Sequence, residues 1–228
     1  MAVAVMVCAF LLSRDATKAG LSPDIAFDLL FWLTVGGIIG ARIFYVMISW
    51  DHFADNLGEI VMINRGGLAW QGGFIGGFSA GAWFVKVKKL KLRIMLDLCA
   101  PYIALGQAIG RIGCFFNGCC YGKPWAFGIY FPVHQARLHP TQLYETSMLF
   151  GIFLVLKFLK RPNLLLGLPV RQAGMVFVLY LWLAAIERFT VEFFRADHET
   201  LLWGLSLFQF IAVGIFAVGC IVFFRIKR

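Results

Sequence analysis

A group of charged residues stands out near residue 190, inside a stretch that is otherwise apolar. Arg188 and Glu192 are four residues apart and Glu192 and Arg195 are three apart, so on a helix the three side chains share one face. Ionisable side chains at membrane depth are costly, and they usually face the interior of a helix bundle and mark a substrate path. The spacing therefore predicts a polar site on this helix, with mutual ion pairing as the alternative interpretation.

Arg111 is a second arginine in a position where it can bind a ligand. Gly110 and Gly113 flank it and leave the guanidinium accessible, beside a long apolar segment that suits acyl chains. The planar fork of a guanidinium matches a phosphate group, so a lipid phosphate is the expected ligand. The alternative is an arginine that extends toward the headgroups without a specific ligand.

Two other polar positions interrupt apolar runs. Gln71 is a lone polar side chain in a glycine-rich segment, where an amide can hydrogen-bond between helices. The run from His139 to Glu145 opens another apolar segment. Thr141 suits the cap of a helix there, and Tyr144 and Glu145 fall in its first turn.

Three of the six cysteines lie close together in the sequence, at Cys114, Cys119 and Cys120. A zinc site formed with a histidine is conceivable, but the spacing C-x4-C-C is not one that structural zinc sites favour. A disulfide within the trio fits better if the segment faces the oxidising side of a membrane. We therefore expect no metal and no cofactor.

Composition defines the elements that must position these side chains. Of the 228 residues, 61% are hydrophobic and 14% are charged, and the mean hydropathy is +0.80, far from that of a water-soluble domain. A bilayer core about 30 Å thick takes about 20 apolar residues per helix. Seven apolar runs can be counted, at 1–13, 25–48, 66–85, 95–116, 142–159, 174–194 and 203–224. The predicted fold class is all-α, a polytopic membrane bundle of about seven transmembrane helices.

The positions of the basic residues explain the net charge of +9 without a nucleic-acid partner. Fourteen of the 21 basic residues lie at the ends of odd-numbered runs, in the connections after them or at the C-terminus. The positive-inside rule therefore predicts an external N-terminus and a cytoplasmic C-terminus. These fourteen residues are Arg14, Lys18, Lys86, Lys88, Lys89, Lys91, Arg93, Lys157, Lys160, Arg161, Arg171, Arg225, Lys227 and Arg228.

The connections between the apolar runs are short, except for one at about 117–141. Glycines and prolines recur along this segment, so it cannot form one helix, and we expect an outward-facing cap with short pieces of secondary structure. Small residues spaced by four, as in Gly36 and Gly40 or Gly72 and Gly76, predict closely packed helices. Without a repeat or a long linker, residues 1–228 are expected to form a single transmembrane domain.

Taken together, these motifs resemble one known family, the phosphatidylglycerol prolipoprotein diacylglyceryl transferases, over nearly the whole chain. Order and spacing agree along with the expected topology. The matching parts are Gly110-Arg111-Ile112-Gly113, Phe115-Phe116-Asn117-Gly118 with Gly122, the run His139 to Glu145, Arg188 with Glu192 and Arg195, Gly40-Ala41-Arg42 with Tyr45, and the pairs Gly66-Gly67 and Gly72-Gly73.

The resemblance implies a multi-pass enzyme of a bacterial inner membrane. It would transfer the diacylglyceryl group of phosphatidylglycerol to the lipobox cysteine thiol of a preprolipoprotein signal peptide, an early step of lipoprotein maturation. Membrane lipid would surround it. By this resemblance the catalytic residues are Arg188, Glu192 and Gln71, the lipid phosphate binds Arg111 and Arg195, and the supporting residues are Asn117, Gly122, Tyr144 and Glu145.

The sequence departs from the family pattern at three positions. Gln71 stands where many members have histidine, and Cys114 and Cys119 replace an asparagine and a glutamate. A glutamine cannot act as a general base, so Glu192 becomes the best candidate. Two other function classes stay open: a non-catalytic or thiol-redox member of the same fold, and a transporter of small anions.

Overall fold

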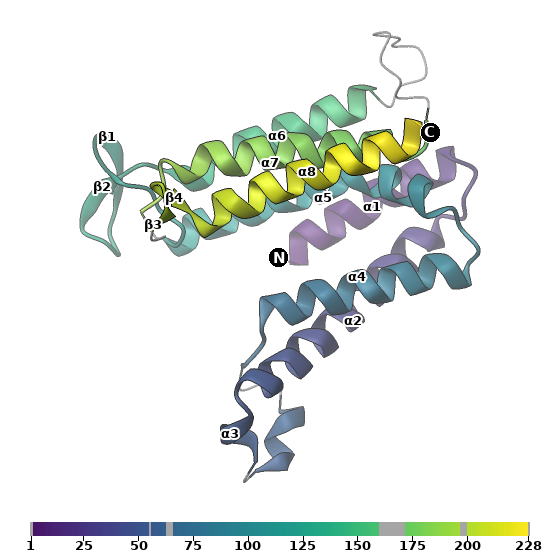
Figure 1. Cartoon of the computed structure of the whole chain (residues 1–228), viewed down its shortest axis with the longest axis horizontal. Helices are drawn as coiled ribbons and strands as arrows, with labels where there is room; N and C mark the ends of the chain where they lie inside the picture. Colours follow the sequence, from purple (N-terminus) through teal and green to yellow (C-terminus); the bar gives the residue numbers. More distant parts are fainter. Residues whose placement is uncertain (1, 55, 63–65, 160–171, 197–199, 228) are drawn as a thin grey trace. The chain divides into compact units, whose positions relative to one another are not determined.

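The structure is a computed structural model that describes residues 2–54, 56–62, 66–159, 172–196 and 200–227. Helices make up most of the described chain (Figure 1). Lys160, Arg161, Arg171 and Arg228, on which the predicted topology partly rests, lie outside the described residues. In chain order the helices are α1 (Ala2–Lys18), α2 (Asp24–Ile48), α3 (Trp50–Phe53), the 3-10 helix η1 (Leu57–Val61), α4 (Trp70–Val87), α5 (Leu92–Asn117), α6 (Thr141–Leu159), α7 (Met175–Glu192) and α8 (Leu207–Lys227).

Each of the seven predicted apolar runs is helical over most of its described length, in α1, α2, α4, α5, α6, α7 and α8. Within the described residues, α2, α5, α6 and α8 are long and apolar enough to cross a membrane. In α8 the large side chains of Val213, Val218 and Ile221 are exposed, while Gln209 and Gly219 are buried. This reversal of the usual soluble pattern is expected where lipid is the solvent. The all-α membrane class is confirmed, and the count of seven spans stays a prediction.

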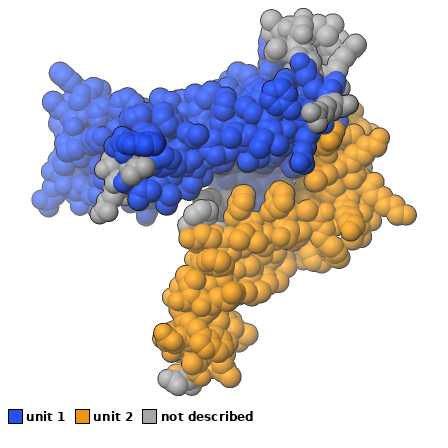
Figure 2. Space-filling view, in the orientation of Figure 1, with its two compact units in different colours: residues 1–11, 96–228 blue, residues 12–95 orange. Residues whose placement is uncertain are grey.

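The chain divides into two compact units, residues 12–95 and residues 1–11 with 96–228 (Figure 2). We call them the α2–α4 unit and the bundle unit. The expectation of one transmembrane domain stays a prediction.

Close contact between α2 and α4 forms the α2–α4 unit. A Cβ added at Gly40 would overlap the carbonyl of Gly72, and a Cβ at Gly76 would overlap the carbonyl of Gly36. The predicted small-residue spacing thus brings these two helix backbones together. The buried Arg42 side chain donates to the carbonyl oxygens of Glu59 at 2.6 Å and Gly66 at 2.7 Å, so it holds the connection between the helices.

The bundle unit has a core formed by α5, α6 and α7. Small residues of α5, Ala100 and Ala104, are fully buried against Leu156 of α6 and Tyr180 of α7. Asp97 of α5 also caps the start of α7. Its carboxylate accepts hydrogen bonds from the backbone N–H groups of Gly174 at 2.6 Å and Phe177 at 2.8 Å, groups that have no partner within the helix.

The cap segment is built around an antiparallel pair of strands, β1 (Pro124–Phe131) and β2 (Ala136–Leu138). A shorter pair, β3 (Thr200–Leu202) and β4 (Leu205–Ser206), precedes α8 at the same end of the bundle unit (Figure 1). The cap segment therefore contains short pieces of secondary structure, as predicted. Its predicted outward orientation stays a prediction.

Candidate active site

The charged face predicted on the sixth apolar run is formed at the end of α7. Arg188 and Glu192 are one helical turn apart, and the Arg188 Nη2 lies 2.9 Å from the Glu192 Oε2. Arg195 follows just after the helix, with its Nε 4.0 Å from the same carboxylate oxygen. The spacing thus brings all three side chains together, as the sequence predicted.

Glu145, the fifth residue of α6, lies at the centre of this cluster and is almost completely buried. The Arg111 Nε lies 2.6 Å from Glu145 Oε2, while the Nη1 atoms of Arg188 and Arg195 donate to Oε1 at 3.0 and 3.1 Å. Three arginines from α5, α7 and the turn after α7 therefore converge on one carboxylate. The ion pair with Arg111 and the charge-assisted hydrogen bonds from Arg188 and Arg195 offset part of the cost of burying these charges.

The three arginines differ in how far they reach the surface of the bundle unit. The side chains of Arg111 and Arg188 are 27% and 21% exposed, whereas that of Arg195 is only 4% exposed. Together with Glu145 and Glu192, these five groups carry one positive charge in excess. An incoming anion would meet Arg111 and Arg188 first, while Arg195 is placed to hold Glu145.

Ser206 and Gln209 support Glu192, and neither residue was predicted from the sequence. The Ser206 hydroxyl donates to Glu192 Oε1 at 2.5 Å. The Ser206 backbone N–H donates to Gln209 Oε1 at 2.9 Å, and the Ser206 Oγ accepts from the Gln209 backbone N–H at 3.4 Å. This is a capping box at the start of α8, which the pattern Ser-x-x-Gln before an apolar run signals in the sequence.

The cap segment closes on the same end of the bundle. The Lys123 backbone N–H donates to the Phe194 carbonyl at 2.8 Å, and Gly122 forms a β-bridge with Arg195.

Aromatic contacts also hold the cap segment. His139 stacks on Trp125 with ring centroids 4.5 Å apart, and its Nδ1 lies 3.2 Å from the Tyr144 hydroxyl. Gly122 and Tyr144, two of the predicted supporting residues, therefore fix the cap beside the arginines.

The remaining predicted site residues are Asn117 and Gln71. Asn117 is exposed at the end of α5, where it precedes the turn into the cap segment. Gln71 is the second residue of α4 and belongs to the α2–α4 unit. The bundle unit thus brings together Arg111, Glu145, Arg188, Glu192 and Arg195, and Gln71 is outside that unit.

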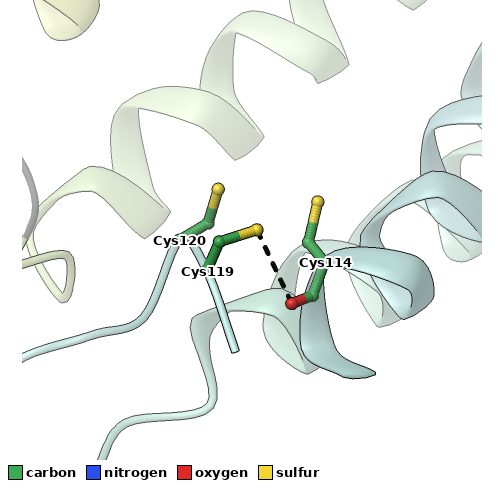
Figure 3. Close-up of side chains that lie close together, drawn as sticks. All are labelled: Cys114, Cys119 and Cys120. Carbon is green, nitrogen blue, oxygen red and sulfur yellow. Dashed lines mark hydrogen bonds between the residues drawn. The ribbon is translucent and has the colours of Figure 1, made fainter. Parts of the chain in front are cut away.

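Cys114, Cys119 and Cys120 follow Arg111 in the chain, and their three sulfur atoms are within 4.8 Å of one another (Figure 3). All six cysteines, which lie in the described part of the chain, are free thiols, so the disulfide considered from the sequence is not formed here. Burial raises the pKa of the Cys119 thiol. Hydrogen bonds with Asn117, Cys120 and Cys114 lower this pKa by more than burial raises it, so the pKa falls below its usual value. A lowered pKa increases the thiolate fraction at neutral pH.

A polytopic helical membrane protein with a buried arginine and carboxylate cluster is the class that this fold and site define. Residues 1–225 match the family described as Prolipoprotein diacylglyceryl transferase. The chain belongs to that family, as its motifs indicated.

Proteins similar to this chain are named as transferases of the same kind. The phosphatidylglycerol–prolipoprotein diacylglyceryl transferase of Finegoldia magna is 36% identical over 93% of this chain and 83% of its own length. Those of Nostoc sp. and Staphylococcus aureus (strain MRSA252) are each 34% identical. The Nostoc protein aligns with 96% of this chain and 80% of its own length, and the staphylococcal protein with 99% and 83%.

Proposed function

We propose that this chain transfers the diacylglyceryl group of phosphatidylglycerol to the lipobox cysteine thiol of a preprolipoprotein. Family membership and the names of the relatives support the reaction. The observation that carries the proposal is the convergence of Arg111, Arg188 and Arg195 on Glu145, beside helices apolar enough to lie in lipid.

The lipid phosphate binds to Arg111 and Arg188, whose guanidinium groups reach the surface of the cluster. In the reaction the lipobox sulfur attacks a glyceryl carbon of the lipid, a C–S bond forms, and the C–O bond to the phosphate breaks. Glycerol phosphate leaves with the electron pair and gains negative charge as it does so. Fixed guanidinium groups in a water-poor site stabilise that developing charge, which lowers the barrier.

Arg195 and Glu145 position the two binding arginines and do not bind the phosphate directly. Arg195 is too deeply buried for direct contact with a lipid headgroup, and its Nη1 donates to the same Glu145 oxygen as Arg188. This role refines the expectation, drawn from the resemblance, that Arg195 binds phosphate. Arg188 is also held from its other side, because its guanidinium carbon lies 4.9 Å from the centre of the Phe208 ring.

Glu192 orients Arg188 and accepts the thiol proton as the sulfur attacks. Its Oε2 pairs with Arg188, and its Oε1 accepts a hydrogen bond from the Ser206 hydroxyl, so the carboxylate is fixed in place. Gln71 has no basic group and serves to position substrate. The enzyme resides in the bacterial inner membrane, with an external N-terminus and a cytoplasmic C-terminus, as the basic residues indicate.

Complementation of cells depleted of their own transferase tests this function, together with a purified assay of phosphatidylglycerol and a lipobox peptide. Arg188→Ala and Glu192→Gln should abolish lipidation and glycerol phosphate release, and Gln71→Ala should cost much less. Asp28→Asn is the matched control, since Asp28 pairs with Lys88 at an exposed position of α2.

Two outcomes would contradict the proposal in different ways. A folded wild-type chain that neither complements nor releases glycerol phosphate is not a transferase. An inactive Gln71→Ala variant beside a fully active Glu192→Gln variant would show that the division of roles is wrong.

A further inference from the structure

The end of α5 brings two cysteines together by a standard helix-ending geometry. Gly118 takes a positive φ of 69°, its N–H donates to the Phe115 carbonyl at 3.1 Å, and the Cys119 N–H donates to the Cys114 carbonyl at 3.2 Å. These are the two hydrogen bonds of a Schellman motif, which normally places two apolar side chains in contact. Here the contact positions are Cys114 and Cys119, so the chain reversal places thiol beside thiol.

Cys120 completes the trio through an unusual backbone conformation. Its φ is +60°, a value that a side chain with a Cβ rarely adopts, and such strain persists only where the surroundings impose it. Thr141 Oγ1 donates to the Cys120 carbonyl at 2.7 Å, and Gln142 Nε2 donates to the Cys119 carbonyl at 2.6 Å. Both donors are fully buried in α6, so the helix fixes the segment that carries the second and third thiols.

We propose that Cys114, Cys119 and Cys120 form a three-thiolate site for one soft, thiophilic metal ion, with Cu(I) as the best match. With metal–sulfur bonds of about 2.3 Å, three sulfurs around one ion lie about 4 Å apart. The thiol sulfurs already lie within 4.8 Å of one another, so rotation of the side chains suffices to close the site. The spacing of the cysteines in the sequence argued against a metal. That argument took no account of the chain reversal at Gly118, which brings the thiols together.

The donor set distinguishes among metals. Structural zinc sites almost always have four ligands, and within the described residues the group of candidate ligands contains three sulfurs alone. Cu(I) favours soft thiolates. Arg111 lies one turn before Cys114 on α5, so its positive charge offsets the negative charge of a three-thiolate complex. Binding releases the thiol protons to solvent and changes no oxidation state.

The test uses the full-length protein in detergent, reduced and kept free of oxygen, with Cu(I) added against a chromogenic Cu(I) chelator. We expect one Cu(I) retained per chain, with three sulfur neighbours by X-ray absorption, and weaker retention of Zn(II). Changes beyond the first ligand shell cost up to about 100-fold in metal affinity, so Cys119→Ser should cost at least that. Cys220→Ser, a half-buried thiol in α8, is the matched control and should bind normally.

Alkylation of the wild-type protein, followed by mass spectrometry, keeps the test independent of variant folding. Cu(I) should protect Cys114, Cys119 and Cys120, and leave Cys220 labelled as before. Failure to retain Cu(I), unchanged labelling of the trio, or tighter binding of Zn(II) than of Cu(I) would overturn the proposal. A Cys114–Cys119 disulfide that persists under reductant would also overturn it, in favour of a structural cross-link.

Discussion

Glu145 is the residue on which the candidate site depends most. It is the fifth residue of α6, and the family resemblance implied only a supporting role for it. In the folded chain its two oxygens contact three arginines, including one 43 and one 50 residues away in the sequence. The positions of Arg111 and Arg188 are therefore coupled through one buried carboxylate, and changes at Glu145 should affect both binding and stability.

The Arg111→Lys variant tests whether the planar guanidinium fork is required. A lysine keeps the charge but cannot make two parallel hydrogen bonds to a phosphate. Hydrogen bonds to charged groups contribute about 1.5–3 kcal/mol, so we expect transfer activity to fall roughly ten- to hundredfold. Activity of the purified variant with phosphatidylglycerol is the measurement.

Arg93→Lys is the matched control, because Arg93 is exposed on the same helix, and it should keep full activity. An Arg111→Lys enzyme that is folded and as active as the wild type would remove Arg111 from the phosphate site.

Glu145→Gln should destabilise the bundle unit as well as inactivate it. Removing one partner of a buried ion pair leaves uncompensated charge and costs about 3–5 kcal/mol, and here several arginines lose the same partner. Denaturant titration of the protein in detergent or lipid measures the loss in the free energy of unfolding. Asp28→Asn removes an exposed partner of Lys88, and for such a pair the expected change is at most about 1 kcal/mol. Equal losses in the two variants would argue against Glu145 as the centre of the cluster.

At the scale of elements, hydropathy alone locates the seven long helices, because each predicted apolar run is helical over most of its described length, while the short helices α3 and η1 were not predicted. Local signals also define two helix ends: Asn117-Gly118 closes α5, and the capping box of Ser206 and Gln209 opens α8. What the sequence does not encode locally is which elements meet. The contacts of Glu145 with Arg111 and of Ser206 with Glu192 depend on the packing of the helices, and no short pattern predicts them.

Docking of the cap segment onto the bundle requires a glycine at position 122. A Cβ there would lie 2.5 Å from the His139 Cβ and 2.6 Å from the Phe194 carbonyl oxygen, distances at which the backbones must move apart. Gly122→Ala should therefore loosen the cap, raise proteolytic cleavage within residues 122–139 and reduce activity severalfold or more. Limited proteolysis and the transfer assay measure both effects.

Gly151→Ala is the control for this change, because a Cβ at Gly151 in α6 meets no atom within 4 Å. Alanine has the higher helix propensity, by about 1 kcal/mol, so this variant should be at least as stable as the wild type. A Gly122→Ala protein with wild-type cleavage and activity would show that the close approach is not required.

At the scale of the whole molecule, composition was the most informative property of the sequence. A chain that is 61% hydrophobic and 14% charged cannot bury all its apolar side chains, and the structure leaves many of them exposed on its helices. The close approach of α2 and α4 was also foreseen, from glycines spaced by four. The division into two compact units was not foreseen, because it depends on contacts between distant segments.

The orientation of the chain in the membrane is the last prediction. Fourteen of the 21 basic residues lie at the ends of odd-numbered apolar runs, in the connections after them or at the C-terminus, and positively charged segments resist translocation. Reporter fusions after Lys91 and Arg228 should therefore be cytoplasmic, and an insertion beside Lys123 in the cap segment should be external. Paired reporters, one fluorescent only in the cytoplasm and one active only outside it, measure each site. The reverse pattern would place the cap segment and the cluster around Glu145 nearer the cytoplasmic face, where a secreted lipobox cysteine could not reach them.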